Sequence, residues 1–242
     1  MATDAKPGLS PIWIALSKGE MRITGRLVDA TNATLLANVI HNENEIVCIY
    51  KPIAGERPLW DFSTGTLAHR EYAAYLVSSL ANFNVVPLTI LREGPYGAGM
   101  VQEWISIDES LDMSEFFRRD DPALRNIALF DAVINNTDRK IGHLLPDVQG
   151  KVYGCDHGVT FHSQDKLRTV LWQWAGKPLS NSELLQIREL MNLLSGSLGE
   201  LLLPLLSTEE LTALDARLER LLAARTFPVP SDEWPAVPWP PF

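Results

Sequence analysis

The fold is predicted most directly by one segment, Phe130-Asp-Ala-Val-Ile-Asn-Asn-Thr-Asp-Arg-Lys-Ile-Gly-His143. Its apolar residues have helical spacing, and from Asn135 onward they give way to a loop dense in amide, acidic and basic side chains. A second segment, Cys155-Asp-His-Gly-Val159, follows an apolar run and places a carboxylate beside a glycine where a strand ends. Each segment alone fits an ordinary turn, but the two together indicate a catalytic site.

The sequence before this stretch predicts an antiparallel sheet with one helix. Two apolar runs within residues 21–40, separated by turn formers at 29–34, predict a hairpin, and residues 45–51 predict a third strand that ends at Pro52. Residues 67–80 are rich in Ala and Leu at helical spacing and predict a helix. Short apolar runs at 85–91 and 99–105 predict two further strands.

After residue 105 the pattern becomes helical. Helical spacing occurs at 111–119, 122–135, 180–193 and 208–224, and strand-like residues return only at 152–155. The tail contains Pro228, Pro230, Pro235, Pro238, Pro240 and Pro241, which predict an extended chain. We therefore divide the chain into an N-terminal segment (1–20), an N-terminal lobe (21–105), a helical C-terminal lobe (106–226) and a Pro/Trp-rich extended tail (227–242).

The composition is that of an ordinary globular protein, with 242 residues, 46% of them hydrophobic, and a formal net charge of -9. No apolar run is long enough for a membrane span, and the N-terminus lacks a secretory signal, so we expect a cytoplasmic protein. The acidic charge makes nucleic acid an unexpected partner, and the oligomeric state is left open. The only cysteines, Cys48 and Cys155, are expected to be reduced thiols.

Phosphoryl transfer from ATP requires a cation on the phosphates, a group that holds this cation, acidic metal ligands and a carboxylate for the attacking hydroxyl. Lys51 ends the third predicted strand, and Glu71 lies near the start of the following helix, an order that allows the two to form an ion pair. Thr31, Asn32 and Thr34 lie on the preceding hairpin, where they could contact phosphates, although this hairpin lacks a Gly-rich signature.

The segments Asn136-Thr-Asp-Arg139 and Asp156-His-Gly158, with His143 five residues after Asp138, resemble the catalytic and metal-binding loops of PI3/PI4-kinase-like proteins. They are particularly similar to type II phosphatidylinositol 4-kinases, whose catalytic loop also reads Asn-Thr-Asp-Arg, and more distantly to HipA-like bacterial kinases. The resemblance, closest to a small actinobacterial branch, covers residues 20–225 and implies an α+β, bilobal protein-kinase-like fold. In this fold an antiparallel sheet with one helix forms the N-terminal lobe, and the C-terminal lobe is mainly helical.

The resemblance also implies roles for single residues. Lys51 would hold the α- and β-phosphates and pair with Glu71, Asp138 would orient the acceptor hydroxyl, and Asp156 would bind Mg²⁺. The hinge that faces adenine would consist of Glu103, Trp104 and Ile105. His143 stands where the family has an Asn as second metal ligand, and an imidazole nitrogen suits Mn²⁺ better than Mg²⁺.

Four basic residues near these loops could act on phosphate groups. Arg139 and Lys140 could neutralise a transferring or acceptor phosphate, or could be solvated surface charges. Lys166 and Arg168 lie where kinases keep an activation or substrate segment, and they would suit a phosphorylated acceptor. We expect the tryptophans of the second half to be packing anchors, namely Trp172, Trp174, Trp234 and Trp239.

The sequence thus predicts an ATP-dependent phosphotransferase that uses Mg²⁺ or Mn²⁺ and moves the γ-phosphate to a hydroxyl of an unidentified lipid, small-molecule or protein acceptor. A nucleotide-binding pseudokinase or regulatory module is an alternative, because His143 replaces an Asn and no Gly-rich loop is present. A nucleotidyl transferase with ATP bound in a flipped orientation is another. A metal-dependent hydrolase that uses Asp138, His143, Asp156 and His157 is a third.

Overall fold

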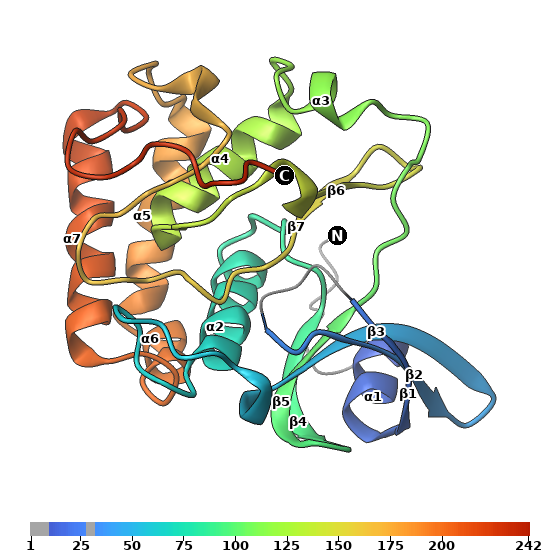
Figure 1. Cartoon of the computed structure of the whole chain (residues 1–242). Coiled ribbons are helices and arrows are strands. Elements are labelled where there is room, and N and C mark those ends of the chain that lie inside the picture. Colours follow the sequence, from blue (N-terminus) through green and yellow to red (C-terminus); the bar gives the residue numbers. More distant parts are fainter. Residues whose placement is uncertain (1–9, 28–31) are drawn as a thin grey trace, which may run out of the picture.

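The computed structural model describes residues 10–27 and 32–242, which form a sheet lobe and a helical lobe (Figure 1). The sheet is antiparallel, with the strand order β1-β2-β3-β5-β4. Its strands are β1 (Glu20–Arg26), β2 (Leu35–His41), β3 (Asn44–Pro52), β4 (Thr89–Gly94) and β5 (Gly97–Glu103). The chain is therefore α+β and bilobal, which confirms the predicted fold class.

A short helix that the sequence did not predict covers one face of the sheet. Helix α1 (Pro11–Lys18) begins at Ser10, whose Oγ accepts a hydrogen bond from the Trp13 amide at 3.1 Å. Leu16 of α1 packs in a core with Met21, Val39 and Val101 of the sheet. Part of the predicted N-terminal segment therefore belongs to the first lobe.

Helix α2 (Leu67–Leu80), predicted to belong to the sheet lobe, packs into both lobes. It contacts β4 and β5 as well as α5 (Asn181–Leu194) and α6 (Ser197–Leu202). Its Ala73, Ala74 and Val77 are fully buried and share the larger hydrophobic core with Phe130 of the helical lobe. The helix that carries Glu71 is thus fixed from both sides (Figure 1).

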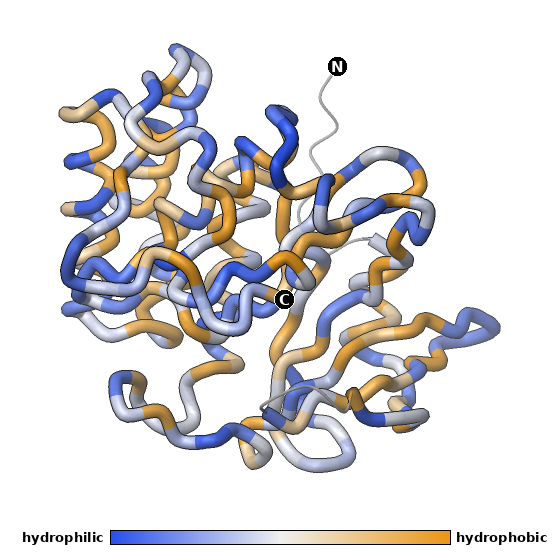
Figure 2. Tube along the Cα trace, turned by 45° about the horizontal axis from the view of Figure 1, so that its top comes forward, coloured by the Kyte–Doolittle hydropathy of each residue, from blue (hydrophilic) through white to orange (hydrophobic). Residues whose placement is uncertain are grey.

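The helical lobe surrounds the larger core, which appears as orange segments in Figure 2. Besides α5 and α6 its helices are α3 (Met113–Phe116), α4 (Pro122–Ile134) and α7 (Thr208–Ala224). The hairpin β6 (Leu144–Pro146) and β7 (Val152–Gly154) lies next to α4, and two 3₁₀ turns cover Ile141–His143 and Trp172–Trp174. A third 3₁₀ turn, Ile53–Gly55, follows β3.

Two predicted elements, at 111–119 and 85–91, differ clearly from the structure. The helix predicted at 111–119 is only the single turn α3, and α6 and β6 were not predicted. The strand predicted at 85–91 begins at Thr89, because the amides of Val85 and Val86 donate to Ser78 Oγ at 2.9 and 3.1 Å instead of to a neighbouring strand. Local side-chain hydrogen bonds therefore decided where this strand starts.

The tail 227–242 has no helix or strand and lies along the helical lobe. Its carbonyl groups accept hydrogen bonds from the site region: Ala236 from the Thr169 amide at 3.1 Å, and Pro241 from the Ile141 amide at 2.8 Å. Trp174 is 1% exposed, as expected for a packing anchor, whereas the prediction is wrong for Trp239, which is 86% exposed. No helix in the described part of the chain is both long and apolar enough to span a bilayer.

Candidate active site

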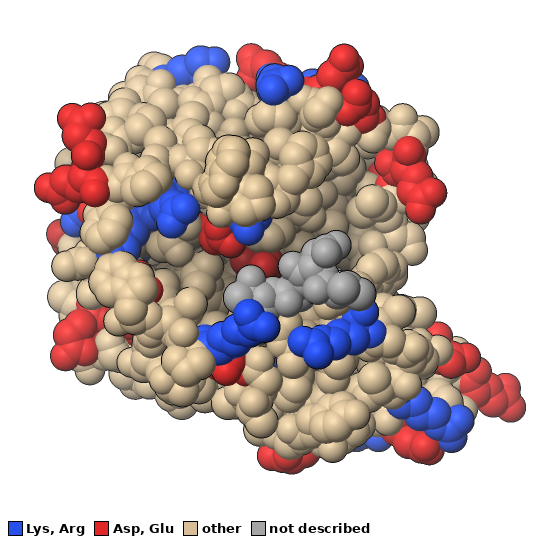
Figure 3. Space-filling view, in the orientation of Figure 1, with Lys and Arg blue, Asp and Glu red and all other residues tan. Residues whose placement is uncertain are grey.

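Three charged side chains from distant parts of the sequence meet between the two lobes. Lys51, on β3, donates to Glu71 Oε1 at 2.6 Å and to Asp156 Oδ1 at 2.8 Å. Glu71 comes from α2, and Asp156 follows β7, so one ammonium group links the sheet to the helical lobe. Figure 3 shows acidic side chains within a hollow on this face of the molecule.

The backbone around Asp156 aims its carboxylate at Lys51. Asp156 has a φ of 61°, a left-handed conformation that Asp adopts more readily than most residues. The next amide, of His157, donates to Glu71 Oε2 at 2.9 Å. Glu71 therefore holds Lys51 with one oxygen and the Asp156–His157 turn with the other. A strained turn held by such contacts is typical of a functional site.

The charges in this network stabilise one another. Burial alone would lower the pKa of Lys51, but Asp156 and Glu71 outweigh it, and the pKa is raised. Lys51 in turn is the main cause that holds the pKa of Asp156 well below its usual range. At neutral pH the site thus holds a positive ammonium group between two carboxyl groups. Burial is the main cause that raises the pKa of Glu71, and Lys51 partly offsets this rise.

Asp138 lies in the same region, on the loop that follows α4. Its amide donates to Asn136 Oδ1 at 3.0 Å, and its Oδ2 lies 3.5 Å from Lys140 Nζ. Burial raises the pKa of Asp138, Lys140 and Arg168 partly offset this, and the negative charge of Asp156 adds to the rise. The Asp138 carboxylate is thus partly buried and lies beside a cation.

The structure corrects the prediction for Arg139, which was expected to face a phosphate. Its side chain is fully buried and forms an ion pair with Asp131 of α4, with Nη2 2.9 Å from Oδ1. Its Nη1 donates to the Cys155 carbonyl at 2.8 Å, and Nη2 lies 2.7 Å from His157 Nε2. Arg139 therefore ties the Asp138 loop to the Asp156 loop from behind. Asp131 was not among the predicted site residues, although it lies in the same segment, 130–143, as Asp138 and His143.

We predict that Asp131→Asn strongly destabilises the protein, because it leaves the Arg139 charge buried without its partner. Breaking such a buried pair typically costs about 3–5 kcal/mol. The matched control is Glu20→Gln, whose ion pair with Arg22 is exposed and is expected to contribute less than about 1 kcal/mol. Urea unfolding followed by fluorescence measures both. Equal small losses in the two variants would contradict a linking role for Arg139.

His143 lies beside Asp156, with its Nε2 3.4 Å from Asp156 Oδ2. Its Nδ1 accepts a long hydrogen bond from the Lys140 amide at 3.4 Å. A neutral imidazole whose Nδ1 accepts a hydrogen bond carries its ring proton on Nε2, whereas a metal ligand needs a free lone pair there. With its ring proton on Nε2, His143 is a polar neighbour of Asp156 and presents no lone pair there, and its role as a second metal ligand stays a prediction.

We predict that His143→Asn leaves the ratio of Mg²⁺- to Mn²⁺-supported activity unchanged within about twofold, because no nitrogen ligand is lost. Burial is the main cause that lowers the pKa of His143 to about 4, so the ring stays neutral as the pH falls from 8 to 5.5. Titration of His143 should therefore cause no loss of kcat/KM near pH 6.5, and the acid limbs of the pH profiles should be the same in the unaltered protein and in the variant. A clear shift of preference towards Mg²⁺ would restore the metal-ligand role.

The predicted hinge residues lie at the end of β5. Glu103 pairs with Cys48 in the sheet, its amide donates to the Leu88 carbonyl at 2.9 Å, and the Trp104 amide donates to the Val47 carbonyl at 3.1 Å. Ile105 follows, at the start of the connection between the lobes. Glu103 thus ends β5, the strand next to the one that carries Lys51, and Trp104 and Ile105 follow it at the lobe boundary.

The predicted phosphate-binding hairpin is only partly described, and Thr31 lies outside the described residues. Asn32 Oδ1 accepts from the Arg57 amide at 2.9 Å. The Thr34 side chain is buried, and its carbonyl accepts from the Leu27 amide at 2.9 Å. These contacts hold Asn32 and Thr34 in the hairpin and do not connect either residue to Lys51.

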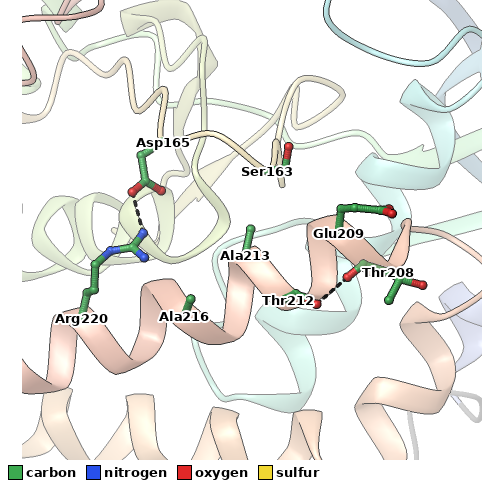
Figure 4. Close-up of a pocket in the computed structure, with 8 residues that line it drawn as sticks. All are labelled: Ser163, Asp165, Thr208, Glu209, Thr212, Ala213, Ala216 and Arg220. Carbon is green, nitrogen blue, oxygen red and sulfur yellow. Dashed lines mark hydrogen bonds and ion pairs between the residues drawn. The ribbon is translucent and has the colours of Figure 1, made fainter.

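Lys166 is also placed differently from the expectation. Its ammonium group is buried, lies 3.0 Å from Asp61 Oδ2, and is 4.7 and 4.5 Å from the ring centroids of Trp60 and Trp234. It therefore joins a sheet-lobe loop to the tail and is unavailable to a substrate phosphate. The groove in Figure 4, between α7 and the loop 163–165, contains Arg220 and Glu209 but none of the predicted site residues.

The candidate metal site contains one good ligand from the protein, Asp156. Among residues 10–27 and 32–242 no group of three His, Cys, Asp or Glu residues could hold a metal ion. His157, the fourth residue of the hydrolase alternative, is fully buried against Arg139 and Phe130. A protein-only zinc cage is thus not formed by these residues. One carboxylate fits Mg²⁺, which usually takes its other ligands from water and nucleotide phosphates.

Comparison with known proteins adds little about chemistry. No protein-family model matches the sequence. Protein Rv2133c of Mycobacterium tuberculosis is 40% identical over 262 aligned positions, which cover 94% of each chain. Among solved structures, the proinflammatory kinase CtkA of Helicobacter pylori matches 88% of this chain and 94% of its own, with 11% identity and a TM-score of 0.45.

Proposed function

The chain belongs to the same family as Protein Rv2133c, and we propose that it is an ATP-dependent phosphotransferase. The observation that supports this function most strongly is the contact of Lys51 with both Glu71 and Asp156. In protein kinases a strand Lys paired with a helix Glu holds the phosphates, and an Asp after a strand holds the metal ion. Here the same three residue types converge from the same kinds of elements.

Each side chain then has a distinct part in the transfer. Lys51 would leave Asp156 for the phosphates and keep its bond to Glu71. Asp156, which lies beside His143, would bind Mg²⁺, and the ion would neutralise phosphate charge. Asp138 would accept the proton of the acceptor hydroxyl as the hydroxyl oxygen bonds to the γ-phosphorus and the bond to the leaving ADP breaks. The raised pKa of Asp138 suits a carboxylate that must take up a proton.

The adenine would lie against the end of β5. The amides of Glu103 and Trp104 are already used within the sheet lobe, whereas the Ile105 amide has no partner in the described part of the chain. We assign Ile105 as the hinge donor to an adenine nitrogen, with Glu103 and Trp104 fixing its position.

Lys51→Ala should weaken the binding of a non-hydrolysable ATP analogue about tenfold or more. One charge-assisted contact to phosphate in a closed site contributes roughly 1.5–3 kcal/mol. Calorimetry on folded protein measures this, with Lys18→Ala, an exposed lysine at the end of α1, as the control. Glu71→Gln retains Lys51 and should produce a smaller loss. If Lys51→Ala binds as the unaltered protein does, Lys51 is not part of the nucleotide site.

Asp138→Asn and Asp156→Asn should abolish transfer in different ways. The first should leave the affinity for the magnesium–nucleotide complex unchanged, and the second should reduce it, because only Asp156 would contact the metal. Incubation with γ- or α-labelled ATP shows which group is transferred. Transfer of the γ-label supports the kinase. Transfer of the α-label alone would identify a nucleotidyl transferase. Tight nucleotide binding without turnover would identify a pseudokinase.

A further inference from the structure

The chain segment that contains Arg168 is fixed directly alongside the Asp138 loop. The Arg168 amide donates to the Asn136 carbonyl at 2.9 Å, and the Arg168 carbonyl accepts from the Arg139 amide at 3.1 Å. The Val170 amide completes the pairing by donating to the Arg139 carbonyl at 3.2 Å. The backbone of Arg168 is therefore held next to the loop that carries Asp138.

The tail fixes this region from the other side. It accepts hydrogen bonds from the Thr169 amide and from the Ile141 amide, so it pairs with both the Arg168 segment and the Asp138 loop. The backbone of Arg168 and Lys140 is thus held by hydrogen bonds among three adjacent segments. A ligand that binds their side chains would not have to order this backbone. A preorganised site of this kind loses less free energy when a ligand binds.

Two cations flank Asp138 in this frame. Lys140 Nζ lies 3.5 Å from Asp138 Oδ2, and the charge of Arg168 also acts on this carboxylate. Arg168 Nε is buried and has no hydrogen-bond partner among the described residues. The other two cations nearby are already paired, Arg139 with Asp131 and Lys166 with Asp61. Lys140 and Arg168 are therefore the basic groups that remain for a substrate.

We propose that Lys140 and Arg168 bind a phosphate group carried by the acceptor, so that the substrate is a hydroxylated phosphate ester. This inference rests on the proposed function, because it places the acceptor hydroxyl at Asp138. Two cations match the nearly dianionic charge of a phosphate monoester, and an Arg side chain can bind two of its oxygens at once. Binding would also draw Lys140 away from Asp138, leaving that carboxylate free to accept a proton.

The net charge of the chain supports a local site over general attraction. At a formal charge of -9 the molecule as a whole repels anions, so a phosphorylated acceptor needs cations placed at the point of reaction. A phosphate ester can be a soluble monoester with nearly two negative charges or the diester headgroup of a lipid with one, and both present phosphate oxygens to Lys140 and Arg168. The experiment has to separate these two sources.

Inorganic phosphate is the first probe, added to the full chain saturated with a non-hydrolysable ATP analogue and Mg²⁺, so that the nucleotide site is filled. Phosphate should bind to the unaltered protein, and Arg168→Gln and Lys140→Gln should each weaken it about tenfold or more by calorimetry. The charge-matched controls Arg188→Gln and Lys18→Gln, both at exposed positions, should leave it unchanged. Glycerol 3-phosphate and vesicles of phosphatidylglycerol then compete with phosphate, with glycerol as the uncharged control.

Displacement by glycerol 3-phosphate supports a soluble acceptor, and displacement by the vesicles alone supports a lipid. The inference is wrong if phosphate does not bind, if Arg168→Gln and Lys140→Gln bind it as the controls do, or if neither ester displaces it. The proposed function is scored separately by binding of the ATP analogue. A chain that binds the analogue but not phosphate keeps the phosphotransferase proposal and loses the phosphate-ester acceptor.

Discussion

The buried ion pair between Arg139 and Asp131 is the interaction on which the site depends. Arg139 is fully buried, and its guanidinium contacts α4 through Asp131, the Cys155 carbonyl and the His157 ring. Two loops that are separate in sequence are thereby held at fixed distance, with Asp138 on one and Asp156 on the other. The guanidinium also packs closely against β7. It requires a glycine at position 154, because a Cβ there would come within 3.0–3.2 Å of it.

The Lys51 network performs the corresponding task between the lobes. A sheet residue, a residue of α2 and a residue after β7 meet at one partly buried ammonium group, and α2 itself contacts both lobes. The relative position of the lobes is thus coupled to the charge state of the site. Under the proposed function, phosphate would replace Asp156 as a partner of Lys51, and nucleotide binding would then change the contact between the lobes.

The basic residues of this molecule fall into two groups, those in buried ion pairs and those near Asp138 and Asp156. Arg139, Lys166 and Arg70 are buried and paired with Asp131, Asp61 and Glu210. A buried charge without its partner is strongly unfavourable, so these cations are committed to the fold. Lys51, Lys140 and Arg168 are the basic residues in this region that the proposed function assigns to phosphate groups.

The fold class and the candidates Lys51, Glu71, Asp138 and Asp156 could be predicted from the sequence alone, because apolar periodicity and the polar density of two loops are local properties. Which polar groups lie at the site and which are buried behind it became clear only from the three-dimensional contacts. Arg139 and Lys140 are neighbours in the chain, yet one is buried on Asp131 and the other lies beside Asp138. Likewise, the role of His143 depends on which groups contact its two nitrogens. Burial and hydrogen-bond partners come from residues far apart in sequence, so no local pattern contains them.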